Sequence, residues 1–419
     1  MQRSTLLNSF ASTTPSAQRN VLRVLALTLW LLGSAYTLKG TLYMFTSAPD
    51  LGMRWTEFQY VRRGTNPLDV WEQADALKHN RPPPTMARPR EADVVAELGE
   101  SPGGYPPWAY TVAALFAWPR FELARVLFGA LNLVGFGFCL LWAYRIGRNT
   151  SAELGMTLAG AVFAVASICT TFGLGQYGVI VISALVGALV LDERKQHFLA
   201  GILLGVSLTK ISLSAPFLVP FVLTRRIRST AAAALYVAAG SLVVWVVTDT
   251  DPLTMLGQMV RCTQAFIASG YSLINGFASV GVSTHASSLL AAGSCVLLTT
   301  VVCWLWRDVP LLVHFAVAGT ASRLWTYHQH YDNLIELFLL LALGMRARHN
   351  TSALAAFLLV GVGLWAPAQV CDMRFFQVYQ LVVWPSATAV LLWITPRVAS
   401  SAEVVVPEQS IDTRNLLKV

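Results

Sequence analysis

The sequence predicts an all-α polytopic membrane protein, and three observations favour this class. Hydrophobic residues make up 55% of the 419 residues and charged residues only 12%, and the mean hydropathy is +0.55. Apolar runs at 154–191, 229–248 and 375–396 reach the ~20 residues needed to cross a bilayer. Lipid offers no partner to bare backbone, and the alternation typical of membrane barrels is absent, so these runs must be helices. We expect about 11 to 13 membrane helices within residues 21–396.

The net charge of +8 comes from short basic clusters at the ends of apolar runs. This pattern argues against a nucleic-acid surface and marks cytoplasmic helix ends. Residues 1–20 are Ser/Thr-rich, and with Arg23 they favour a cytoplasmic N-terminal tail. The six cysteines and seven histidines show no metal-ligand spacing. Cys262 and Cys371 fall in expected external loops, so a disulfide between them stays open.

The first apolar segment, 22–45, is longer than a signal-peptide core and lacks a convincing cleavage site, so we interpret it as a retained anchor. Residues 46–104 then form a large, mixed-charge extracytoplasmic loop. Aromatic and basic residues interleave at 55–63 and 70–78, which indicates short helices lying at the membrane surface.

Polar turns divide the later apolar runs at 192–195, 225–228, 307–308 and 346–349. The run at 154–191 is long enough for two crossings with a turn at 173–178. Residues 249–285 are predicted to be a second loop, and residues 397–419 a disordered tail.

Two charged residues stand at membrane depth or at its boundary. Asp50 follows the first apolar segment and is either a hydrated loop carboxylate or a base for an acceptor hydroxyl. Lys210 lies inside the apolar run 198–223, where a cation costs roughly 2.5 to 3.5 kcal/mol on insertion scales. It either reaches towards an interface or neutralises the phosphate of a lipid substrate.

A polar cluster at 323–336 separates two further apolar runs. Its Arg323 has the fork geometry that binds phosphate oxygens. His328 and His330 are two residues apart, a spacing that disfavours a shared metal site in an extended loop. Asp332 and Glu336 are one helical turn apart if the next helix has begun.

Four motifs in sequence order resemble glycosyltransferase family 87, polytopic enzymes of the GT-C superclass. The first is Asp50, then Gly64 fourteen residues later and Asn66-Pro67, with Trp55 and Tyr60 between them. The others are Tyr105-Pro106-Pro107-Trp108, Gly175-Gln176, and residues 201–212 with Lys210. Two departures occur: Gly178 stands where the family often has Asn, and Ile211 and Ser212 follow Lys210 where a proline is usual.

The resemblance implies a GT-C-type bundle that transfers a mannose-like hexose from a polyprenyl-phosphate donor to an extracytoplasmic lipid or glycan acceptor, with inversion. Charge placement favours Asp50 as the general base, with Glu57 as the fallback, and Lys210 and Arg323 as ligands of the donor phosphate. The resemblance adds a histidine near that phosphate, and we assign this role to His330. Support of the substrate loop is expected from Glu57, Tyr60, Gly64, Tyr105, Gln176 and Asp332. No metal site or bound cofactor is predicted, and metal dependence stays open. The implied location is the plasma membrane, with no nucleic-acid partner.

The topology of 105–148 is ambiguous. If both apolar runs, 105–118 and 121–144, cross the membrane, the basic loop Arg145–Arg148 lies outside, against the positive-inside rule; if the first is re-entrant, the loop lies inside. We expect two crossings because of the family resemblance. The main alternative function is a transporter or a lipid-linked-sugar flippase, although the two halves show none of the internal similarity common in transporters.

Overall fold

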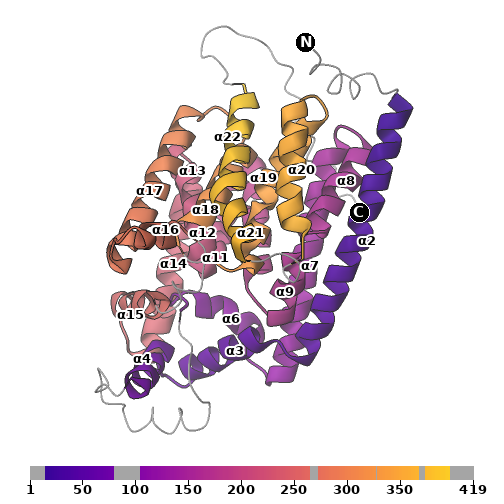
Figure 1. Cartoon of the computed structure of the whole chain (residues 1–419). Helices are drawn as coiled ribbons and strands as arrows, with labels where there is room; N and C mark the ends of the chain where they lie inside the picture. Colours follow the sequence, from indigo (N-terminus) through magenta and orange to yellow (C-terminus); the bar gives the residue numbers. More distant parts are fainter. Residues whose placement is uncertain (1–14, 80–103, 265–271, 327, 368–372, 397–419) are drawn as a thin grey trace.

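The computed structural model describes residues 15–79, 104–264, 272–326, 328–367 and 373–396, and all its regular elements are helical (Figure 1). The predicted all-α class is therefore confirmed. The Cys262–Cys371 question lies outside the described residues, because Cys371 does. In chain order the α-helices are α2 (Pro15–Thr46), α3 (Pro49–Arg62), α4 (Pro67–Lys78), α6 (Ala109–Ala117), α7 (Phe121–Arg148), α8 (Ala152–Phe163), α9 (Ser167–Leu174), α10 (Gly178–Glu193), α11 (His197–Ser207), α12 (Ile211–Ser214), α13 (Leu218–Leu223), α14 (Ile227–Thr248), α15 (Pro252–Gln264), α16 (Leu273–Ser279), α17 (Thr284–Leu305), α18 (Leu311–Leu324), α19 (Leu337–Ala347), α20 (Thr351–Trp365), α21 (Met373–Val378) and α22 (Trp384–Ile394).

By length and composition, six described segments could cross a membrane, and the bent pair α8–α9 raises the number to seven; one of the six, residues 197–223, reverses direction, as described below. This is fewer than the 11 to 13 expected from apolar runs. The difference arises because several runs form short helices: α10, α18 and α20 have 16, 14 and 15 residues. At 1.5 Å per residue, such helices are about 21 to 24 Å long, less than the ~30 Å hydrocarbon core. The protein is a multi-pass membrane protein by helix length and hydropathy.

The bundle has two chemically different ends, which we name by residues of α2 and α3. Helix α2 runs along its whole height (Figure 1). At the Arg23 end, where α2 begins, Arg23 pairs with Glu153 at 3.2 Å, which places the start of α8 and the finish of α7 there. At the Asp50 end, where α2 finishes, the short helices α3, α4, α6 and α15 cover the bundle (Figure 1).

This arrangement corrects the expected topology of residues 105–148. Helix α6 has only nine residues, about 14 Å, and packs on α3, where Gln59 Nε2 donates to the Ala117 carbonyl oxygen at 2.7 Å. It does not cross the membrane. Helix α7 alone spans the bundle, so Arg145 and Arg148 lie at the Arg23 end with the other basic turns. The positive-inside rule was the better guide here than the family resemblance.

The helices predicted at 55–63 and 70–78 are present as parts of α3 and α4, and their position at a membrane surface stays a prediction. The predicted turn within 154–191 is present between α9 and α10. Residues 249–285, expected as a second loop, contain α15 and α16.

The segment from α11 to α13 reverses direction. Gly201 and Gly205 of α11 pack against Ser229 and Tyr236 of α14 in the same order, so these two helices run parallel. Ser322 Oγ of α18 donates to the Leu213 carbonyl oxygen at 2.7 Å, and Phe217 packs on Phe315, which shows that residues 211–223 run back antiparallel to α18. The chain therefore turns within residues 208–217, and Lys210 lies at that turn.

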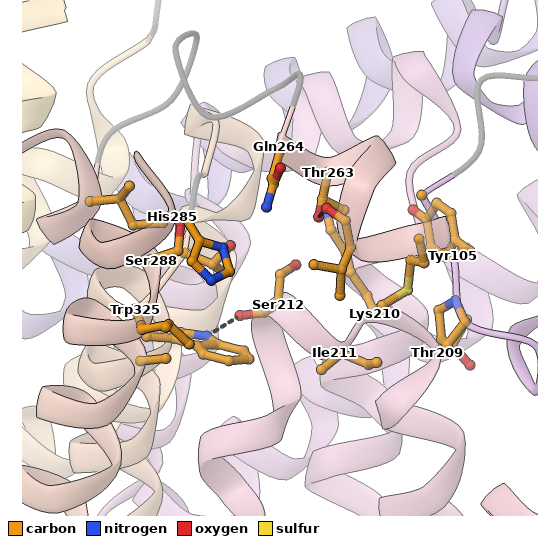
Figure 2. Close-up of a pocket in the computed structure, with 18 residues that line it drawn as sticks. Tyr105, Thr209, Lys210, Ile211, Ser212, Thr263, Gln264, His285, Ser288 and Trp325 are labelled. Carbon is orange, nitrogen blue, oxygen red and sulfur yellow. Dashed lines mark hydrogen bonds between the residues drawn. The ribbon is translucent and has the colours of Figure 1, made fainter. Parts of the chain in front are cut away.

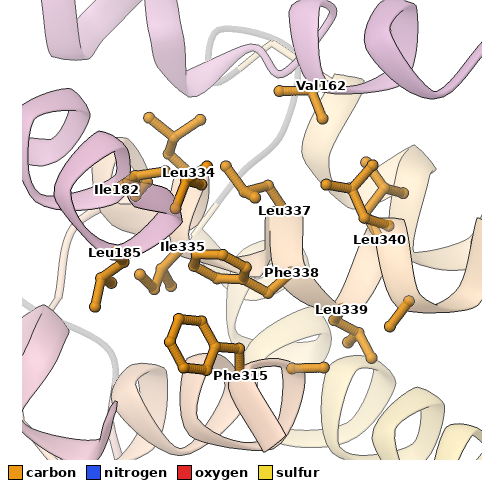
Figure 3. Close-up of a cluster of buried hydrophobic side chains, with 14 of the residues drawn as sticks. Val162, Ile182, Leu185, Phe315, Leu334, Ile335, Leu337, Phe338, Leu339 and Leu340 are labelled. Carbon is orange, nitrogen blue, oxygen red and sulfur yellow. The ribbon is translucent and has the colours of Figure 1, made fainter. Parts of the chain in front are cut away.

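The main hydrophobic core lies above this turn, among α8, α10, α18 and α19 (Figure 3). Phe338 contacts Phe315 and Phe217 with ring centroids 5.2 and 5.5 Å apart, distances typical of favourable aromatic pairs. Leu334 and Ile335 extend this core to the segment that carries Asp332. The packing of Leu334 and Ile335 in this core therefore holds the neighbouring Asp332 in position.

Candidate active site

Asp50 lies in the first turn of α3, at the Asp50 end of the bundle. Pro49 occupies the first helical position, where its missing N–H costs nothing, and Ala48 before it has a left-handed φ of 46°. The half-buried carboxylate accepts a hydrogen bond from Gln176 Nε2 at Oδ2. Its place at a helix N-terminus favours the negative charge.

Gln176 is held in place by the tight turn between α9 and α10. Gly175 has φ of +76°, and a Cβ there would lie 2.5 Å from Leu51 Cβ, so only glycine fits without a shift. The Gln176 N–H donates to the Thr171 carbonyl oxygen at 2.9 Å. The Gly-Gln motif therefore brings the α9–α10 turn against α3 next to Asp50.

Lys210 lies on the other side of the same glutamine. Its Nζ is 3.5 Å from Gln176 Oε1 and 2.5 Å from Asp332 Oδ1, and it lies 4.9 Å from the ring centre of Tyr331. The side chain keeps 12% of its surface exposed. Lys210 is thus ion-paired at the chain reversal and still partly accessible.

Asp332 is buried between two cations, Lys210 and Arg323, and the imidazole of His328. His328 Nδ1 is 3.2 Å from its Oδ2, the Gln329 N–H donates to the same oxygen at 3.4 Å, and Arg323 Nη1 lies 3.9 Å away. Burial alone would raise the pKa of the Asp332 carboxyl, but Lys210, His328 and Arg323 together hold that pKa below its usual range. This direction favours the ionised form of Asp332, the form that pairs with Lys210.

Residues from four distant segments thus form one connected chain, from Asp50 through Gln176 and Lys210 to Asp332. The sequence analysis singled out all four, and the structure brings them together.

Behind Asp50, α3 presents a buried ion pair. Arg54 Nη1 donates to Glu57 Oε2 at 2.7 Å, Glu57 is fully buried, and the Arg54 guanidinium lies 4.5 Å from the ring centre of Tyr105. Tyr105 packs edge-on against Tyr177. This burial gives Glu57 a supporting role without contact to substrate, whereas the half-buried Tyr105 also lines the cavity beside Lys210.

Two further predicted support residues lie in the turn that ends α3. Tyr60 is fully buried, and its carbonyl oxygen accepts from the Thr65 N–H at 3.0 Å. Gly64 has φ of +79°, and a Cβ there would lie 3.3 Å from the Val247 carbonyl oxygen. Both residues set the path of the chain from α3 to α4.

Two other residues that were predicted to bind phosphate, Arg323 and His330, lie outside the line of contacts from Asp50 to Asp332. Arg323 is 1% exposed, and its Nη2 donates to Gln380 Oε1 at 3.1 Å, so it supports Asp332 from beneath. His330 Nε2 lies 3.1 Å from Thr170 Oγ1, and its ring stacks on Phe376. Lys210 is therefore the predicted phosphate ligand best placed to meet a substrate.

A cavity of about 290 Å³ lies beside Lys210 (Figure 2). Its wall includes His285 and Ser288 from the first turns of α17, Thr263 and Gln264 from α15, and Trp325, whose Nε1 donates to the Ser212 carbonyl oxygen at 2.8 Å. The sequence analysis missed His285 and Trp325. Their signal is weak, a histidine at the start of an apolar run and a tryptophan two residues after Arg323.

Metal ligands do not gather in the described part of the chain, where no three His, Cys, Asp or Glu side chains are placed to hold an ion together.

A family model supplies the identity. The model for glycosyltransferase family 87 matches residues 104–343, more than half of the chain and the region that contains Gln176, Lys210, Arg323, His330 and Asp332. Asp50 precedes the matched region. Curated proteins and solved structures give no match. The chain therefore belongs to glycosyltransferase family 87 and is a membrane glycosyltransferase.

Proposed function

We propose that this enzyme transfers a mannose-like hexose from a polyprenyl-phosphate donor to a lipid or glycan acceptor, with Asp50 as the general base. The observation that supports this proposal is the placement of Asp50 and Lys210 on the two amide atoms of Gln176. The acceptor hydroxyl requires a base and the leaving phosphate requires a cation. Asp50 and Lys210 supply these two groups on either side of one neutral side chain.

The reaction follows from these charges. The acceptor oxygen attacks C1 of the hexose, the C1–O bond to phosphate breaks, and the electron pair leaves with the lipid phosphate. Lys210 neutralises the negative charge that develops on the phosphate, while Asp50 takes the hydroxyl proton, which typically contributes 10²- to 10⁴-fold. Direct displacement inverts C1 and needs no second, nucleophilic carboxylate.

Orientation follows from the distribution of basic residues. The helix ends at the Arg23 end carry Arg19, Arg23, Arg145, Arg148, Arg194, Lys195, Arg225, Arg226, Arg228, Arg307, Arg346 and Arg348. Such an excess favours the cytoplasmic side. Asp50 is then extracytoplasmic, on the plasma membrane, where lipid-linked sugars replace nucleotide sugars as donors.

The test uses the full chain in nanodiscs, supplied with membrane-extracted acceptors and labelled polyprenyl-phosphate mannose, polyprenyl-phosphate glucose or a nucleotide sugar. We expect transfer only from the lipid-linked donors. Lys210→Met should raise the KM for donor at least tenfold, because the phosphate loses its cation, and the KM for acceptor should change little.

Lys78→Met is the matched control, because Lys78 is an exposed lysine at the end of α4. It should behave as wild type. An unchanged donor KM in a folded Lys210→Met enzyme would refute the phosphate contact, and transfer from the nucleotide sugar alone would refute the donor class.

A further inference from the structure

We infer that the cavity beside Lys210 binds the lipid-phosphate end of the donor, with the polyprenyl chain leaving between α15 and α17 and His285 as a second polar contact to the phosphate. This inference rests on the proposed function. It assigns a direction to the donor, which the family assignment leaves open.

The first argument is the position of the cavity relative to Asp50. Among the described residues, its walls come from residues 104–106, the chain reversal at 209–212, α15, α16, α17 and residues 325–326. None comes from α2, α3, α9 or α10, which surround Asp50 and Gln176. Lys210 is the residue shared by the cavity and the Asp50–Gln176 chain.

The second argument is stereochemical. In a direct displacement the acceptor oxygen and the leaving oxygen lie on opposite faces of C1. With Asp50 beside the acceptor and Lys210 beside the phosphate, the hexose must lie towards Gln176. The lipid attached to the phosphate must then extend away from Asp50, which is the direction of the cavity.

The third argument is the lining. The walls are mostly apolar, with Ile211, Val260, Leu289 and Ala292 among them. Leu289 is 63% exposed on the outer face of α17, so the cavity adjoins the surface that faces lipid. An isoprenoid chain can therefore begin in the cavity and continue into the bilayer without leaving apolar surroundings.

The fourth argument is the polar rim. His285 projects into the cavity from α17, opposite the Lys210 side, and Gln264 points towards the same space (Figure 2). Imidazole N–H and amide N–H groups donate to phosphate oxygens. After transfer the lipid phosphate carries one more negative charge than the donor did, so these contacts hold the product as well.

The experiment measures binding of labelled polyprenyl phosphate to the purified full chain in nanodiscs, with polyprenol and inorganic phosphate as competitors. Polyprenyl phosphate should bind at least tenfold more tightly than either competitor, because it alone has both a phosphate group and an isoprenoid chain. Ala292→Trp fills the cavity and should weaken binding at least tenfold. Leu298→Trp, the same bulky side chain on the outer face of α17, is the matched control and should leave binding unchanged.

His285→Ala should weaken polyprenyl phosphate several-fold and leave polyprenol binding unchanged. Val260→Trp fills the opposite wall and replaces Ala292→Trp if that variant does not fold. Equal affinities for folded Ala292→Trp, Val260→Trp and Leu298→Trp would overturn the inference, and so would equal competition by inorganic phosphate.

The two proposals fail separately in this design. Lipid-phosphate binding that depends on Ala292, without any sugar transfer by wild type, refutes the proposed function and keeps the cavity assignment. Normal transfer by a folded Ala292→Trp enzyme refutes the cavity assignment and keeps the function.

Discussion

Two buried aspartates in the described part of the chain have similar partners and lie at opposite ends of the bundle. At the Arg23 end, Asp192 is 2% exposed and pairs with Arg226, with His197 Nδ1 at 3.0 Å and Ser229 Oγ at 3.1 Å. At the Asp50 end, Asp332 is 4% exposed and contacts Arg323, His328 and Lys210.

The difference lies in what surrounds each cluster. The partners of Asp192 come from α11, from the α13–α14 turn and from α14, and no residue of that cluster lines the cavity. Asp332 holds Lys210, which lines the cavity and reaches Gln176. A buried Asp–Arg–His cluster by itself therefore only holds helices together. It becomes part of a candidate site when one of its members, here Lys210, is also accessible from a cavity.

The largest effect on stability is expected for Asp192→Asn, which leaves Arg226 without its buried carboxylate. Breaking a buried ion pair costs about 3 to 5 kcal/mol, and the lower value is expected because Arg226 is partly exposed. The thermal midpoint in detergent should fall, while turnover per folded molecule stays at the wild-type level.

Asp332→Asn is the matched change in the other cluster. It should lose donor binding, because Lys210 loses the anion that positions it. If Asp192→Asn lost turnover without losing stability, the contrast between the two clusters would fail.

Sequence reasoning identified the residues of the site better than it identified their contacts. Asp50, Gln176, Lys210 and Asp332 stand out because charge or a glycine-bearing turn is unusual beside apolar runs. Asp192 and Arg226 lie in two separate polar turns of the sequence, and nothing local shows that they meet. Too many membrane helices were expected, and two crossings were preferred to the re-entrant alternative at 105–148, because apolar composition does not reveal where a helix breaks or reverses.

A smaller effect is expected for Gly175→Ala, which tests how the Asp50 end is positioned. The added methyl would lie 2.5 Å from Leu51 Cβ at a φ of +76°, and such strain costs of order 1 to 3 kcal/mol. Turnover should fall along with stability because the Gln176–Asp50 contact shifts.

Gly137→Ala in α7 is the control, since a Cβ there has no neighbour within 4 Å. Alanine in a helix interior should stabilise slightly, by up to ~1 kcal/mol. Equal melting temperatures and rates for the two variants would contradict the positioning role of Gly175.

The smallest effect is expected for Arg23→Ala at the Arg23 end. Its ion pair with Glu153 is 3.2 Å long, but the Arg23 side chain is 64% exposed. Exposed pairs contribute about 0.2 to 1 kcal/mol, so melting temperature should change little and turnover not at all. A large loss of activity in this variant would contradict the assignment of the active site to the Asp50 end of the bundle.

The most direct test of the account is the single-turnover rate of Asp50→Asn at saturating donor. Asparagine keeps the size and can still contact Gln176, but its amide cannot take the acceptor proton. We predict a rate at least 100-fold lower, with unchanged donor affinity and melting temperature, whereas Glu57→Gln, changed behind the site, should keep donor affinity and most of the rate per folded molecule. A near-wild-type single-turnover rate in Asp50→Asn would contradict the assignment of Asp50 as the base.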